Sequence, residues 1–83
     1  MSEIAGKHIL ITGAASGIGR LVGLKMAALG GRVTGWDIHA QRLDQTVAEL
    51  KQAGREPAHG FVCNVAKRDE VYRAVNATAV KTT

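Results

Sequence analysis

The segment Leu10–Arg20, LITGAASGIGR, decides the fold of this 83-residue chain. It places three glycines, Gly13, Gly17 and Gly19, directly after one apolar run and directly before another. The preceding run, His8–Thr12, is rich in β-branched and aliphatic residues, which is typical of a strand buried on both faces of a parallel sheet. After Gly17 the apolar residues recur at helical intervals, so the glycines lie in a turn between a strand and a helix.

The rest of the chain continues this alternation of strand-like and helix-like stretches, with no repeat, low-complexity tract or linker. The helical spacing that begins at Gly17 stops at the Gly30-Gly31 pair. The predicted strands are His8–Thr12, Arg32–Asp37 and Gly60–Cys63, and the later predicted helices are Ala40–Ala53 and Asp69–Ala79.

The second helix has the clearest amphipathic pattern, because Leu43, Val47 and Leu50 form one apolar stripe among polar residues. Gly54 is expected to end it in the left-handed conformation that glycine adopts readily. In the last helix, the residues expected on the inner side are Val71, Val75 and Ala79.

Strands that alternate with helices of this length are joined by right-handed crossovers and form a parallel sheet with helices on both faces. The predicted fold class is therefore α/β, in three αβα layers. In the first strand–helix turn, Gly13 lets the chain leave the strand tightly, while Gly17 and Gly19 let the backbone approach a pyrophosphate. The start of the helix would offer those phosphates its unpaired N–H groups and the positive end of its macrodipole.

An acidic residue supports this interpretation of the glycines. Asp37 ends the second predicted strand, eighteen residues after Gly19, where its carboxylate can accept hydrogen bonds from both hydroxyls of an adenine ribose. The alternative is an ordinary tight turn followed by a surface aspartate.

The motif Thr12–Gly19, T-G-x-x-x-G-x-G, resembles the N-terminal motif of the short-chain dehydrogenase/reductase family. Gly6-Lys7 before the first strand and Cys63-Asn64-Val65 after the third extend the resemblance. It implies the first βαβαβ(α) half of a Rossmann fold: one NAD(P)-binding domain over residues 1–83, incomplete because the fourth strand and the catalytic half are absent. The cofactor-binding residues it implies are Gly13, Ala15, Ser16, Gly17, Ile18, Gly19, Asp37, Ile38, Asn64 and Val65.

Asn64 departs from the family, whose members usually carry an Asp-Val pair against the adenine. Its side-chain oxygen can still accept from the adenine amino group, although it brings no charge. The alternative is a polar residue that merely ends the strand.

The resemblance and the charges together favour NAD over NADP. Asp37 would stand where the 2′-phosphate of NADP lies, and two negative groups in a partly desolvated site repel each other. Family members that use NADP tend to carry a basic residue at the positions that Ser16 and Ile38 occupy here. Arg42, one turn into the next helix, is expected to face water.

The catalytic residues of the family find no match in this chain. Its members carry a catalytic serine and a Tyr-x-x-x-Lys pair, but Tyr72 is the only tyrosine and Asn76 stands four residues later. The resemblance thus implies the cofactor-binding portion of an oxidoreductase that transfers hydride between a nicotinamide and an alcohol or carbonyl group. The alternative is a catalytically inactive, truncated module that binds nucleotides or pairs with another chain. In the family's sheet the first strand pairs on its other side with the fourth strand, so the resemblance implies that one edge of His8–Thr12 is uncovered here. An uncovered edge favours pairing with a second copy, as a homo-oligomer, or with a complementary chain.

Composition argues against other classes. The net charge is +4, but the eleven basic residues are spread along the chain and only three aromatic residues accompany them, unlike a nucleic-acid binder. No apolar run approaches the length of a membrane span. The single cysteine, Cys63, and the lack of metal-ligand spacing predict no disulfide and no metal site, so we expect a soluble, cytoplasmic chain.

Overall fold

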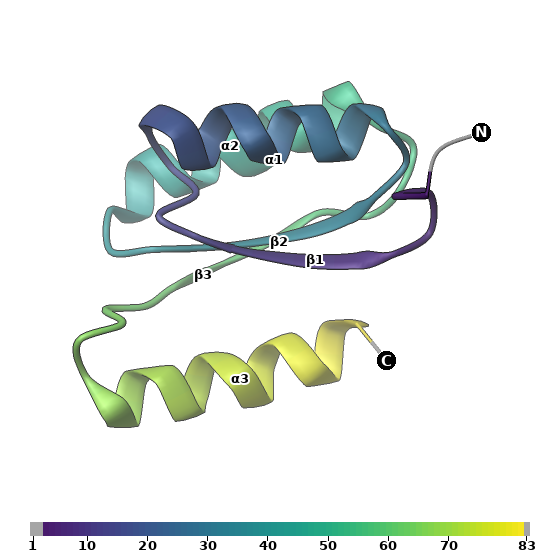
Figure 1. Cartoon of the computed structure of the whole chain (residues 1–83). Coiled ribbons are helices and arrows are strands. Elements are labelled where there is room, and N and C mark those ends of the chain that lie inside the picture. The colour runs from purple at the N-terminus through teal and green to yellow at the C-terminus, as the bar shows by residue number, and fades with distance from the viewer. Residues whose placement is uncertain (1–2, 83) are drawn as a thin grey trace.

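The computed structural model describes residues 3–82, in which three strands alternate with three helices (Figure 1). The third strand begins and ends one residue earlier than predicted, and the last helix extends three residues beyond Ala79. The elements are β1 (His8–Thr12), α1 (Gly17–Ala28), β2 (Arg32–Asp37), α2 (Ala40–Ala53), β3 (His59–Val62) and α3 (Arg68–Thr82).

The three strands form one parallel sheet in the order β1-β2-β3. His8 of β1 is in register with Arg32 of β2, and Thr34 of β2 with His59 of β3. Helices α1 and α2 lie together on one face of this sheet and α3 lies on the other, which confirms the predicted three-layer arrangement (Figure 1). All three strand–helix loops therefore meet at one end of the sheet, on the left of Figure 1.

The core on the α2 side forms as the apolar stripe predicts. Leu43 and Leu50 are buried, Val47 is half-buried, and Val33 of β2 packs against Leu50. The buried residues of α1 are instead small, Gly23 and Ala27. A Cβ at Gly23 would already touch the side chains of Ile11 and Leu50, so α1 lies very close to the sheet.

Leu24 and Met26 of α1 pack against this core, but several other large apolar residues at or near α1 face away from it. Ile18 is 80% exposed and Leu21 is 62% exposed, and Val22 and Leu29 are also exposed. Leu10 of the neighbouring strand β1 is 48% exposed. We call Leu10, Ile18, Leu21, Val22 and Leu29 the β1–α1 apolar surface.

Two expectations about helix packing are wrong. Gly54 is extended (φ −137°, ψ 174°) and not left-handed. Glycine is needed there because the end of α1 passes so close that a Cβ would collide with the carbonyl oxygen of Ala27. On α3, Val75 and Ala79 are exposed. Val71 lies on the inner side as predicted, but it is followed there by Ala74 and Thr78. These smaller residues make room for the indole of Trp36, whose Nε1–H donates to Thr78 Oγ1 over 3.0 Å.

Within residues 3–82, no helix combines the length and the apolar character needed to cross a membrane.

Candidate functional site

The loop between β1 and α1 depends on glycine for its backbone conformation. Gly13 (φ 68°) and Gly17 (φ 56°) both lie in the left-handed region, which strains other residues. Apart from the adjacent residues and the nearby backbone of α1, no described atom lies within 4 Å of the position where either residue would carry a Cβ. The backbone of the loop is thus open to close approach by a ligand.

Gly19 has a different requirement. A Cβ at this position would collide with the backbone carbonyl oxygen of Gly13, so only glycine lets the first turn of α1 pack against the loop. The three glycines of the motif therefore divide their tasks: two shape the loop and one brings the helix against it.

The start of α1 is prepared for an anion. Its N-cap, Ser16, is extended (φ −157°, ψ 163°), and the Ser16 side chain makes no capping hydrogen bond. The first turn carries no acidic residue. Because the first N–H groups of a helix have no partners within the helix, their partial positive charge is left for a ligand such as a phosphate.

The carboxylate of Asp37 joins this loop to the end of β2. Its Oδ2 accepts from the backbone N–H of Ala15 over 3.0 Å, and its Oδ1 accepts from the N–H of His39 over 2.9 Å. Burial alone would raise the pKa of this carboxyl, but the N–H groups of His39 and Ala15, with the charge of His39, outweigh it and hold the pKa below its usual value. A negative charge is therefore fixed at this position.

Residues at the end of β2 and in the loops that follow the three strands line an open pocket of about 170 Å³. Five of the ten predicted cofactor-binding residues line it, namely Gly13, Asp37, Ile38, Asn64 and Val65, and Trp36 and Cys63 complete the wall. Ala15 is joined to the pocket through its hydrogen bond to Asp37. The other four, Ser16–Gly19, do not line the pocket and form the start of α1 beside the glycine loop.

A family model described as short chain dehydrogenase matches residues 7–83. The chain belongs to the short-chain dehydrogenase family. This confirms the resemblance carried by the glycine motif, and the chain corresponds to the NAD(P)-binding portion of such a dehydrogenase.

Epidermal retinol dehydrogenase 2 of Mus musculus is 40% identical over 74 residues, which are 89% of this chain and 24% of that protein. A crystal structure of NAD⁺-bound xylitol dehydrogenase matches 98% of this chain and 31% of its own, with a TM-score of 0.92 and 25% identity. A short-chain dehydrogenase/reductase from Burkholderia phymatum in complex with NAD is 35% identical, with a TM-score of 0.83 over 93% of this chain and 27% of its own. The chain spans about a quarter of the length of the curated relatives it matches.

In this short-chain dehydrogenase chain, Asn64 has a role beyond the one its side chain suggested. Its Oδ1 accepts from the N–H of Ala66 over 3.0 Å, closing a turn in the loop after β3. A carbonyl oxygen has two lone pairs, so one remains for a second donor.

Sequence reasoning missed several residues that build the site. Gly35 lies under the loop, where a Cβ would come within 2.7 Å of the Ala14 side chain, and a glycine inside a strand is a known signal of such close approach. Cys63 was expected as a buried strand residue; it is buried just after β3 and also lines the pocket. Burial raises the pKa of its thiol, and the nearby charge of Glu70 raises it further.

Arg20 directly follows the glycine motif, but its guanidinium does not face the loop. It forms a two-point ion pair with the carboxylate of Glu49 on α2, with Nε donating to Oε1 over 3.0 Å and the terminal nitrogen donating to Oε2. This hydrogen bond is the main reason that the pKa of Glu49 lies below its usual value. The pair links α1 to α2.

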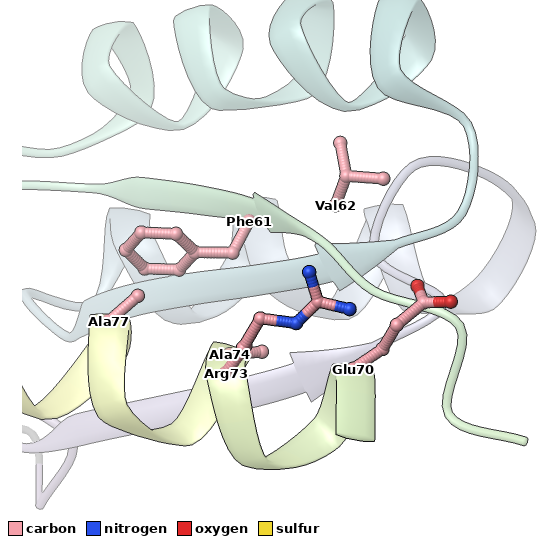
Figure 2. Close-up of a pocket in the computed structure, with 6 residues that line it drawn as sticks. All are labelled: Phe61, Val62, Glu70, Arg73, Ala74 and Ala77. Atoms are coloured by element: carbon pink, nitrogen blue, oxygen red, sulfur yellow. The ribbon is translucent and has the colours of Figure 1, made fainter. Parts of the chain in front are cut away.

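A second, larger groove of about 300 Å³ lies between β3 and α3 (Figure 2). None of the ten predicted residues lines it. Its walls are Phe61, Val62, Glu70, Arg73, Ala74 and Ala77.

Proposed function

We propose that this chain binds NAD(H) in preference to NADP(H), as the cofactor-binding portion of an oxidoreductase that transfers hydride between a nicotinamide and an alcohol or carbonyl group. Residues 1–83 would act as one cofactor-binding domain. The proposed contacts are Gly13, Ala15, Ser16, Gly17, Ile18, Gly19, Asp37, Ile38, Asn64 and Val65.

The observation that carries the proposal is the fixed carboxylate of Asp37 at the pocket. Each carboxylate oxygen already accepts one backbone N–H and has capacity for another donor, such as a ribose hydroxyl. A 2′-phosphate at the same place would meet a negative charge that is 7% exposed and therefore weakly screened. No basic side chain is available at Ser16 or Ile38 to offset that repulsion.

The surroundings of the pocket suit the other parts of a dinucleotide. The open backbone at Gly13 and Gly17 and the uncapped start of α1 fit a pyrophosphate. Ile38 is 55% exposed and Val65 is 59% exposed, and both line the pocket. A flat adenine ring between them would remove this apolar surface from water.

The nicotinamide, when bound, supplies the centre that accepts or donates hydride. The role of this chain is to bind and orient the adenine half of the cofactor. Tyr72, 62% exposed on α3, takes no part in the proposal.

Trp36 provides the test, because it lines the pocket and is the only tryptophan of the chain. Titrating the chain with NADH and with NADPH should quench Trp36 saturably, with tighter binding of NADH. In Asp37→Asn the difference between the two cofactors should shrink. Asp44→Asn removes the same charge from an exposed position on α2 and should leave the difference intact. Equal affinity for both cofactors in the unmodified chain overturns the NAD preference, and no binding to a folded chain overturns the function.

A second candidate function is pairing with another copy of the chain, and the β1–α1 apolar surface favours it. In residues 3–82, β1 pairs with a strand on one side only, so its other edge offers backbone N–H and C=O groups to a further strand. Antiparallel pairing of β1 with β1 of a second copy would join two of these apolar surfaces in one symmetric contact.

We also propose a cytoplasmic location, which rests on the single free thiol of Cys63.

A further inference from the structure

One wall of the pocket is built from a segment without regular secondary structure, residues 63–67 between β3 and α3. Such a segment holds its shape only if its backbone groups find partners. The N–H of Cys63 donates to the carbonyl of Asp37, and the N–H of Lys67 donates to the carbonyl of Asn64, each over 3.0 Å. The N–H of Ala66 donates to the Asn64 side chain.

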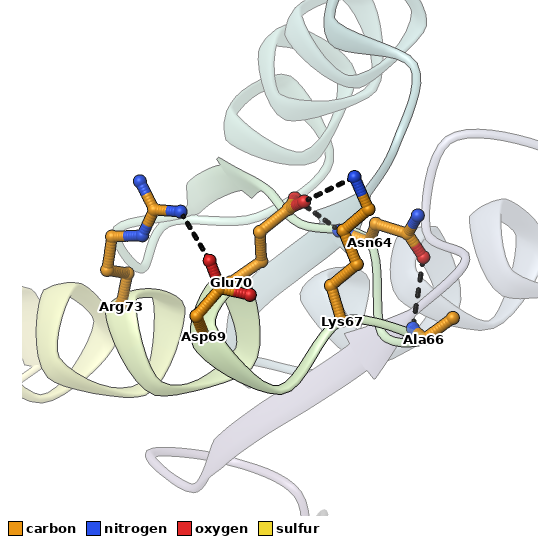
Figure 3. A network of polar contacts seen from close by, with 6 residues as sticks. All are labelled: Asn64, Ala66, Lys67, Asp69, Glu70 and Arg73. Atoms are coloured by element: carbon orange, nitrogen blue, oxygen red, sulfur yellow. Dashed lines mark hydrogen bonds and ion pairs between the residues drawn. The ribbon is translucent and has the colours of Figure 1, made fainter.

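The N–H of Asn64 is held differently, by a side chain from the following helix. Glu70, in the first turn of α3, reaches back so that its Oε1 accepts from the Asn64 N–H over 3.0 Å (Figure 3). Its Oε2 lies 3.8 Å from Nζ of Lys67, so it also forms an ion pair with the last residue of this segment. The carboxylate thus fastens the wall of the pocket to α3.

A simpler role for Glu70 is the usual one of an acidic residue near a helix N-terminus, where it interacts favourably with the macrodipole. Asp69 lies in the same turn and serves that purpose equally. Its side chain is 77% exposed and, among the described residues, pairs with Arg73 on its own helix over 3.2 Å (Figure 3). Of these two neighbouring carboxylates it is thus Glu70 that contacts residues 63–67, through its hydrogen bond to the Asn64 N–H and its ion pair with Lys67.

We propose that Glu70 is a positioning residue for the adenine half of the cofactor: it touches no part of the ligand and acts by holding Asn64 and Val65 in place as a wall of the pocket. This inference rests on the proposed function, because it assigns the wall to the adenine side of the site. Loss of the carboxylate would leave the Asn64 N–H without its partner and let the segment move before the ligand binds. The cost of ordering the segment would then be subtracted from binding.

The test compares Glu70→Ala, Glu70→Gln and Asp69→Ala in the full chain, titrated with ADP-ribose while Trp36 fluorescence is followed. Glu70→Ala should weaken binding about tenfold, since a charge-assisted hydrogen bond is lost. Glu70→Gln keeps an acceptor oxygen and should recover most of the affinity, and Asp69→Ala should bind as the unmodified chain does. Inorganic pyrophosphate, which does not reach this wall, should bind all four proteins equally.

The outcomes separate the two proposals. If the unmodified chain does not bind ADP-ribose, the proposed function fails and this inference fails with it. If the unmodified chain binds and Glu70→Ala binds equally well, only this inference fails. If Glu70→Ala weakens pyrophosphate as much as ADP-ribose, its effect is a general loss of structure and the positioning role is overturned.

A measurement on the unmodified chain keeps the inference testable even if Glu70→Ala does not fold. Amide hydrogen exchange should show the Asn64 N–H protected in the absence of any ligand, because its partner is already in place. Exchange at Asn64 as fast as in an unfolded peptide overturns the inference.

Discussion

The backbone N–H of Ala15 donates to Oδ2 of Asp37 over 3.0 Å, so one hydrogen bond joins the glycine loop to the end of the neighbouring strand. The same carboxylate accepts from His39 in the next turn. Two of the three loops around the pocket are thereby held by a single side chain, before any ligand is present.

This arrangement predicts a specific pH dependence of stability. The pKa of Asp37 is lower in the folded chain than in the unfolded one, so the charged form stabilises the fold at pH values above the unfolded pKa. As the pH falls from that value through the folded pKa, the stabilisation is lost. Urea unfolding at neutral pH and at about pH 3 should show that the loss of stability is smaller in Asp37→Asn than in the unmodified chain. Asp44→Asn is the control. If Asp37→Asn and the unmodified chain lose the same free energy of unfolding between neutral pH and about pH 3, the prediction is contradicted.

Gly17→Ala should impair binding more than stability. The alanine adopts φ 56° at a cost of about 1–2 kcal/mol and places its methyl group in the open space beside the loop. Gly6→Ala is a matched control, because Gly6 also has a positive φ (76°) and open surroundings but lies before β1, at the other end of the sheet. The midpoint temperature of thermal unfolding should fall by a similar amount in both variants. The affinity for NADH should weaken only in Gly17→Ala. Equal binding by the two would show that the loop does not meet the ligand.

Leu21→Lys should reduce self-association if the β1–α1 apolar surface joins two copies. Leucine and lysine have similar helix propensities and Leu21 is 62% exposed, so the fold should tolerate the change. Sedimentation velocity at several concentrations should show a dimer in the unmodified chain and a shift towards monomer in Leu21→Lys. Tyr72→Lys alters a side chain of equal exposure on α3, across the sheet, and should not change the distribution. A monomer at all concentrations in the unmodified chain contradicts the pairing.

Glu70→Gln should lower the pKa of the Cys63 thiol. Burial is the main cause of the raised pKa and persists in the variant, but the negative charge of Glu70 adds to it and is removed. Thiolate absorbance followed through a pH titration measures the shift. Asp69→Asn, which removes a charge that does not act on Cys63, should leave the titration where it was. An unchanged or higher pKa in Glu70→Gln would mean that Glu70 does not lie beside Cys63 in solution.

The order of the elements and five of the seven residues that line the pocket follow from local features of the sequence. Apolar spacing changes between the strand pattern and the helix pattern at Gly17, and parallel strands bring their carboxyl ends to one edge. Asp37 and Asn64, each at or just after a strand end, therefore had to lie near the glycine loop.

The features that escaped prediction depend on contacts between distant residues. Ala74 rather than Val75 lies on the inner side of α3, because the indole of Trp36 on β2 fills the space beside it. Gly54 is extended because α1 passes closely at Ala27. Glu70 has ordinary helix-start chemistry in the sequence, and only the folded path of residues 63–67 brings Asn64 within its reach.

The double use of Asp37 also limits how this protein can be redesigned. In the proposed site, replacing the acid by a residue without a side-chain acceptor, such as alanine or arginine, to admit a phosphorylated ribose would leave two backbone N–H groups without their acceptor. A successful exchange of cofactor would need a second substitution that supplies a new acceptor for Ala15. Selection for a different coenzyme would therefore require two substitutions together. A single substitution at Asp37 would leave the glycine loop less ordered.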